Sequence, residues 1–205
     1  DRWEQKGLMY ERSYNGPKST GYDPLKLKRW DEVFESASRE EVERQCKVEE
    51  YKFKWDSNDF LHLENTRSAV RVHPSGKKVW FNHAHIFHPS VQWAEFKQYI
   101  DHLRRDEFNI FNLLHPVWCW IGMILGMLMV LYKQYIVKQD ATNCSFADGS
   151  PLPSSDLKAV RDAIWKNTKI NKWQKGDMVF LDNLRVSHGR LPFYGPRSVL
   201  VCMNK

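Results

Sequence analysis

Cysteine is scarce in this 205-residue sequence, and its four cysteines (Cys46, Cys119, Cys144 and Cys202) lie far apart. Without a C-x-x-C pair or a dense framework, a zinc ribbon and a disulfide scaffold are both disfavoured. Charge of one sign is not concentrated either, since 31 Lys and Arg are interspersed with 25 Asp and Glu. We therefore expect no nucleic-acid partner. Residues 1–20 are polar and charged rather than a secretory signal, so we favour reduced thiols and a cytoplasmic location.

Large rings and short alternating segments are abundant instead. Aromatic residues make up 14% and hydrophobic residues 42% of the chain, which is enough for a core and typical of a sheet-based fold. Alternation between turn residues predicts strands, and capping residues such as Ser36 or Ser38 predict helices. The expected fold class is mainly β with flanking helices (α+β). The predicted strands are residues 51–55, 61–63, 69–72, 79–81, 178–181 and 198–202, and the predicted helices lie within 31–54 and 154–167.

The middle of the chain holds an apolar stretch, residues 110–132, without a single charged side chain. Its length is close to that of a membrane-spanning helix. Asn112, His115 and Pro116 interrupt its first third, which leaves only residues 117–132 strictly apolar. Three interpretations stay open: a membrane anchor, a buried hydrophobic hairpin, and an artefact of gene modelling such as a retained intron.

The segment from Trp173 to Arg197 carries the residues best suited to chemistry. His188 follows a predicted strand, and Arg190 and Arg197 flank a Pro/Gly loop. A neutral imidazole can bind a divalent metal, while an arginine on the next strand can hold a carboxylate through two parallel hydrogen bonds. A surface histidine beside basic residues is the alternative interpretation.

Three ordered motifs resemble the taurine dioxygenase (TauD/TfdA)-like family, in particular its clavaminate synthase-like branch. The pattern W-Q-x-G-D-x-x-x-x-D-N-x-x-x-x-H-G-R-x-P-F-x-G-P-R occupies residues 173–197. The block H-P-S-G-K-K-V-W-F-N begins at His73, and the loop F-A-D-G-S-P-L-P begins at Phe146. The resemblance covers most of the chain except roughly residues 95–143.

This resemblance implies a distorted double-stranded β-helix (jelly roll) that holds Fe(II) through two His and one carboxylate. It also implies 2-oxoglutarate as co-substrate and O₂ as oxidant, so that oxidative decarboxylation to succinate and CO₂ drives hydroxylation of a small organic substrate. By position, His188 would be the distal iron ligand. Arg197 would hold the 2-oxoglutarate carboxylate, with Arg190 as a second basic group, and Trp80, Asn82 and His85 would line the pocket.

The other two iron ligands are where this sequence departs from the family pattern. The family's proximal H-x-D/E motif precedes the region in which this chain begins, so both ligands are expected to be missing. One H-x-E does occur, at His62 and Glu64, and alternate residues of a strand share a face. Its place in the alignment is wrong for a ligand pair, so it stays a secondary candidate.

Residues 1–205 are therefore expected to form one partial dioxygenase domain, incomplete at its N-terminus, with an atypical apolar insertion at about 105–143. The expected function is that of a fragment of an Fe(II)/2-oxoglutarate-dependent dioxygenase that binds iron weakly and does not turn over alone. The alternative is a membrane-tethered, non-catalytic protein anchored through residues 110–132.

Overall fold

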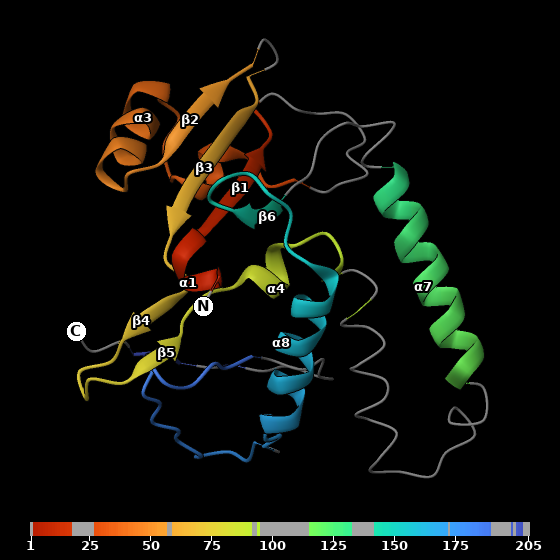
Figure 1. The fold of residues 1–205 in the computed structure, drawn as a ribbon. Helices are drawn as coiled ribbons and strands as arrows, with labels where there is room; N and C mark the ends of the chain where they lie inside the picture. Colours follow the sequence, from red (N-terminus) through yellow and green to blue (C-terminus); the bar gives the residue numbers. More distant parts are fainter. Residues whose placement is uncertain are drawn as a thin grey trace.

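A four-stranded antiparallel sheet lies at the centre of the computed structural model, with the strand order β2-β3-β1-β6. A separate two-stranded hairpin is formed by β4 and β5 (Figure 1). The structure describes residues 2–17, 27–56, 59–91, 94, 115–132, 142–171, 173–189, 198 and 200–202. The described strands are β1 (Leu8–Tyr14), β2 (Lys52–Trp55), β3 (Leu61–Arg67), β4 (Val70–Val72), β5 (Lys78–Trp80) and β6 (Thr142–Phe146). The described helices are α1 (Arg2–Lys6), α2 (Trp30–Val33), α3 (Arg39–Val48), α4 (Ala84–Phe87), α7 (His115–Tyr132) and α8 (Ser154–Asn167).

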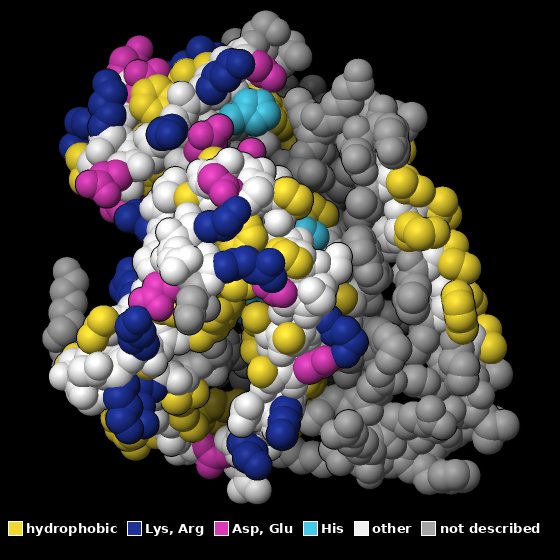
Figure 2. Space-filling model, viewed as in Figure 1, with side chains coloured by type: hydrophobic (Ala, Val, Ile, Leu, Met, Phe, Trp, Pro, Cys, Tyr) yellow, Lys and Arg dark blue, Asp and Glu magenta, His cyan; other side chains and the backbone are white. Residues whose placement is uncertain are grey.

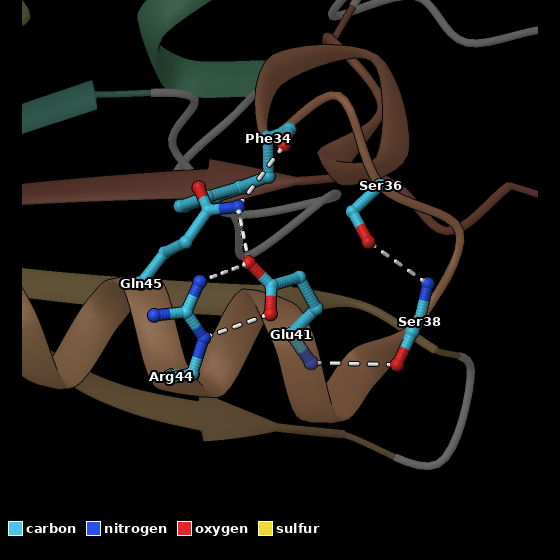
Figure 3. A network of polar contacts seen from close by, with 6 residues as sticks. All are labelled: Phe34, Ser36, Ser38, Glu41, Arg44 and Gln45. Atoms are coloured by element: carbon cyan, nitrogen blue, oxygen red, sulfur yellow. Dashed lines mark hydrogen bonds and ion pairs between the residues drawn. The ribbon is translucent and has the colours of Figure 1, made fainter.

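The predicted helices and most of the predicted strands are confirmed. Ser38 is the N-cap of α3, where its Oγ accepts a hydrogen bond from the Glu41 amide at 3.3 Å. Glu41 then binds Arg44 and Gln45 one turn along, as Figure 3 shows. The Ser38 hydrogen bond satisfies an amide that a helix start leaves without a partner, which favours the start of a helix at this point.

Two clusters of buried side chains hold the described elements together. One lies between the sheet and α8, and the other between the sheet and α3. The first contains Leu8, Ala69, Ala84, Cys144, Phe146, Leu152 and Leu157, and the second contains Tyr14, Trp30, Val42, Cys46, Leu61 and Leu63. Leu61 and Leu63 alternate with the more exposed His62 and Glu64, so β3 presents one apolar and one polar face.

The predicted strand at residues 178–181 is wrong, and the described residues of 198–202 form no strand. Met178, Phe180 and Leu200 are exposed. A strand requires a neighbour that satisfies its backbone amides and carbonyls, and no described strand lies beside these segments. The coarse α+β fold class is thus observed, whereas the jelly roll is not confirmed by the described strands.

α7 lies inside the apolar stretch and runs along one side of the molecule (Figure 1). Its described side chains are largely exposed, as at Trp118, Trp120 and Leu125, and Figure 2 shows hydrophobic side chains along it. Residues 115–132 therefore form an exposed helix, and the interpretation as a buried hydrophobic hairpin is wrong for them. No described helix meets the length and hydropathy needed to span a membrane, and an anchor at residues 110–132 is not supported.

Candidate functional site

Two tight turns shape the segment that carries His188. The Asp177 amide donates to the Gln174 carbonyl at 3.2 Å, and Gly176 between them has φ +96°, a conformation that favours glycine. Residues 174–177 therefore form a turn. Further along, the Asp182 carbonyl accepts from the amides of Arg185 and Val186, both at 3.0 Å.

His188 itself lies two residues beyond that second turn, and its side chain is exposed. Arg190 and Arg197, the residues predicted to bind the co-substrate carboxylate, lie outside the described residues. The structure therefore places His188 on a segment organised by turns and leaves its pairing with the two arginines as a prediction.

The three residues predicted to line the pocket follow one another after β5. Trp80 is 39% exposed, and its ring lies 5.1 Å from that of Trp3 on α1. The Asn82 side chain makes two hydrogen bonds to the backbone: its Nδ2 donates to the Ala69 carbonyl at 2.8 Å, and its Oδ1 accepts from the Ala84 amide at 3.1 Å. Both Asn82 contacts stabilise the entry into α4, a role that sequence reasoning did not anticipate.

His85 is half-buried beside a buried arginine. Arg161 of α8 donates from one terminal nitrogen to the His85 carbonyl at 3.0 Å and to Ser90 Oγ at 2.8 Å. Burial, the charge of Arg161 and the neighbouring His83 together lower the pKa of His85 to about 4. Burial and Arg161 also lower the pKa of His88. His85 is therefore neutral at pH 7 and suited to accepting rather than donating a charge-assisted hydrogen bond.

A pH dependence of stability follows from the low pKa of His85. The unfolded chain takes up a proton near pH 6.5 and the folded chain only near pH 4, so this contribution to stability is complete above pH 6.5. It is lost as the pH falls from 6.5 towards 4, because the unfolded state then binds more protons. We expect His85→Asn to flatten the free energy of unfolding against pH in that window, as measured by urea titrations. Parallel curves for the two proteins would contradict this expectation.

The secondary metal candidates lie on the polar face of β3. His62 Nδ1 is 3.1 Å from Ser13 Oγ on β1. Glu64 is exposed and stands opposite Glu11 of β1 and Lys52 of β2 in the sheet register. Two carboxylates directly opposite one another repel. His62 and Glu64 thus share a face, as predicted from their spacing.

A three-ligand iron centre does not fit the described residues. No group of three His, Cys, Asp or Glu side chains in the described part of the chain is arranged to hold a metal ion. No hydrogen bond or ion pair between described residues joins His188 to His62 or Glu64. The described residues therefore supply one or two candidate ligands at any one place and not a set of three.

Sequence reasoning missed two features of this region. Arg161 is 4% exposed on the apolar face of α8, and a charge at helical spacing from Leu157 and Ile164 is the signal that could have found it. Tyr10 accepts a hydrogen bond from the His83 amide at 3.1 Å through its hydroxyl, and burial raises its pKa. No local pattern marks that contact, since the two residues are 73 positions apart.

Comparison with known proteins gives one family and two relatives. The profile of the "Taurine catabolism dioxygenase TauD, TfdA family" matches residues 27–203. The dapdiamide synthesis protein DdaC of Enterobacter agglomerans is 30% identical over 202 residues, which are 98% of this chain and 50% of DdaC. A clavaminate synthase-like protein of Arabidopsis thaliana is 36% identical over 61 residues, which are 30% of this chain and 18% of that protein. The chain thus spans half the length of its bacterial relative.

Proposed function

Because the chain belongs to the taurine catabolism dioxygenase TauD/TfdA family, we propose that it provides part of an Fe(II)- and 2-oxoglutarate-dependent dioxygenase acting on a small organic substrate with O₂. The family match over residues 27–203 is the observation that carries this proposal. When bound, the iron and 2-oxoglutarate would supply the oxidising chemistry, and the protein would orient them. The cytoplasm is the proposed compartment.

Within this proposal, His188 contributes one iron ligand from the segment that follows the Asp182 turn. Arg197 holds the co-substrate carboxylate, and Arg190 adds positive charge to the same loop. Trp80 and His85 form part of the wall of the substrate pocket. The proposed domain is a jelly roll across residues 1–205 with an apolar insertion at about 105–143.

The 205-residue chain by itself is proposed to bind iron weakly and to form no succinate. This proposal keeps the expectation that the family's proximal H-x-D/E pair is missing from these 205 residues, in which His188 is the one ligand assigned from the motifs. His188→Ala is expected to weaken Fe(II) binding further, by at least about tenfold, as even indirect support of a metal ligand is worth that much. Anaerobic equilibrium dialysis with Fe(II) measures the affinity, and 2-oxoglutarate-dependent succinate formation measures turnover.

Two variants on β3 serve as matched controls in the same assays. His62→Gln and Glu64→Gln are expected to leave Fe(II) affinity unchanged. Unchanged affinity in His188→Ala would show that His188 is no ligand and would overturn the proposed site. Robust turnover that His188→Ala abolishes would instead overturn the claim that the chain alone is inactive, and loss of binding in His62→Gln would transfer the ligand role to β3.

A further inference from the structure

The tip of the β4–β5 hairpin contacts the segment that carries His188. His73 Nε2 lies 2.9 Å from Asp182 Oδ2, although the two residues are 109 positions apart. Among the described residues, this is the one hydrogen bond that joins the segment 173–189 to another part of the chain. Figure 1 shows that segment passing beside the hairpin. The contact therefore links the segment to the tip of the hairpin.

Local contacts decide which nitrogen of His73 carries the proton. The Ser75 amide donates to His73 Nδ1 at 3.0 Å, and Ser75 Oγ lies 2.7 Å from the same nitrogen. A backbone amide can only donate, so Nδ1 is the acceptor and the neutral ring carries its proton on Nε2. Nε2–H then donates to the Asp182 carboxylate. The ring is thus held in the tautomer that the contact requires.

The sequence H-P-S-G explains why the ring is fixed in this way. The Gly76 amide donates to the His73 carbonyl at 2.8 Å, which closes a β-turn with Pro74 at its second position, where the fixed φ of proline is favourable. Gly76 has φ +79°, and the His73 amide then donates to the Lys77 carbonyl at 2.9 Å. In this hairpin the Ser75 amide donates to the imidazole Nδ1, and the His73 side chain is only 14% exposed.

Asp182 uses its two carboxylate oxygens for different partners. Oδ2 accepts from His73, and Oδ1 accepts from the Leu184 amide at 3.1 Å. Partial burial acts to raise the pKa of Asp182, but the hydrogen bonds from His73 and Leu184, together with nearby positive charge, lower that pKa overall. An asparagine has one acceptor oxygen in place of two, so it cannot make both contacts. Asp182 therefore connects the hairpin to the turn before His188.

We propose that His73 is a positioning residue for His188: it holds Asp182, and through it the turn at residues 182–186, at the tip of the β4–β5 hairpin. The role of His188 as a metal ligand rests on the proposed function. The contact itself does not, because it is formed by residues of this chain alone and is measurable without iron or 2-oxoglutarate.

Hydrogen exchange of the full chain tests the contact. In His73→Ala, the amides of Leu184, Arg185 and Val186 are expected to exchange at least about fivefold faster, since a hydrogen bond to a charged group has been lost. His73→Gln is expected to restore much of the protection, because its side-chain amide can donate to Asp182. Asp182→Asn is expected to lose protection at Leu184 or to lose the contact with His73. His62→Gln is the matched control and is expected to leave these amides unchanged.

The ring signals of His73 and His188 in NMR spectra separate a positioning role from general stabilisation. We expect the proton of His73 on Nε2, and we expect the His188 ring signals to move in His73→Ala and to return in His73→Gln. The α3 amides report whether each variant is folded. A proton on Nδ1, unchanged exchange at residues 184–186, or unmoved His188 signals would overturn the proposal. Since no metal is present, these outcomes are independent of the Fe(II) affinity measurements on His188→Ala.

Discussion

Trp30→Ala is expected to lower the free energy of unfolding by about 3–5 kcal/mol, the range found when a large buried ring is removed. Trp30 is 2% exposed within the cluster between the sheet and α3. Its ring meets that of Trp55 edge to face at 5.3 Å, and its Nε1 donates to the Asp59 carbonyl at 3.0 Å. The substitution therefore removes apolar burial, an aromatic pair and a hydrogen bond together.

Urea unfolding followed by circular dichroism measures this loss. Trp30→Phe keeps most of the apolar burial but not the hydrogen bond to Asp59, so we expect a smaller loss of about 1–2 kcal/mol. Trp173→Ala is the matched control, because Trp173 is 49% exposed. We expect it to change stability by less than about 0.5 kcal/mol. Equal losses for Trp30→Ala and Trp173→Ala would contradict the described core.

Arg161→Ala is the second substitution with a large expected effect, a loss of about 2–4 kcal/mol. The guanidinium is buried between α8 and α4, where it donates to the His85 carbonyl and to Ser90 Oγ. In Arg161→Ala the His85 carbonyl and Ser90 Oγ lose this donor, and the space of a long side chain is left unfilled. We expect the stability of Arg161→Lys to lie between those of the unsubstituted protein and Arg161→Ala, because an ammonium replaces the charge but not the fork of donors.

The matched control for Arg161 lies one turn away on the same helix. Lys158 is exposed and pairs with Asp162 at 2.5 Å, and exposed pairs of this kind contribute little. We expect Lys158→Ala to cost less than about 0.5 kcal/mol. Removing the charge of Arg161 also removes one cause of the low pKa of His85, so the pKa of His85 is expected to rise in Arg161→Ala. An unchanged pKa in NMR titrations would show that the charge of Arg161 does not contribute to lowering it.

Much of the local structure could be predicted from residue patterns. The β2 and β3 strands, the Ser38 cap and the α8 helix follow from alternation, capping residues and helical spacing, all of which act within a few residues. The strand predicted at residues 178–181 is wrong because its prediction used alternation alone. Alternation shows that a segment could be a strand, while pairing depends on a neighbour elsewhere in the chain.

The candidate site, too, could be predicted only in part from the sequence. Ordered motifs identify the family, and through it His188, Arg190 and Arg197 as the residues of interest. They do not show that Asn82 serves the backbone at α4. They also do not show that α7 exposes apolar side chains, since exposure depends on what packs against a helix.

By itself the sequence determined the family, the local elements and the H-P-S-G turn, because each is decided by residues that are neighbours in the chain. Only the tertiary structure brought His73 to Asp182 and His85 to Arg161, across 109 and 76 positions. Hydrogen bonds, and the close contacts that shift a pKa, act over a few ångströms, so they depend on which residues the fold places together. The tautomer of His73 and the neutral state of His85 are consequences of that placement.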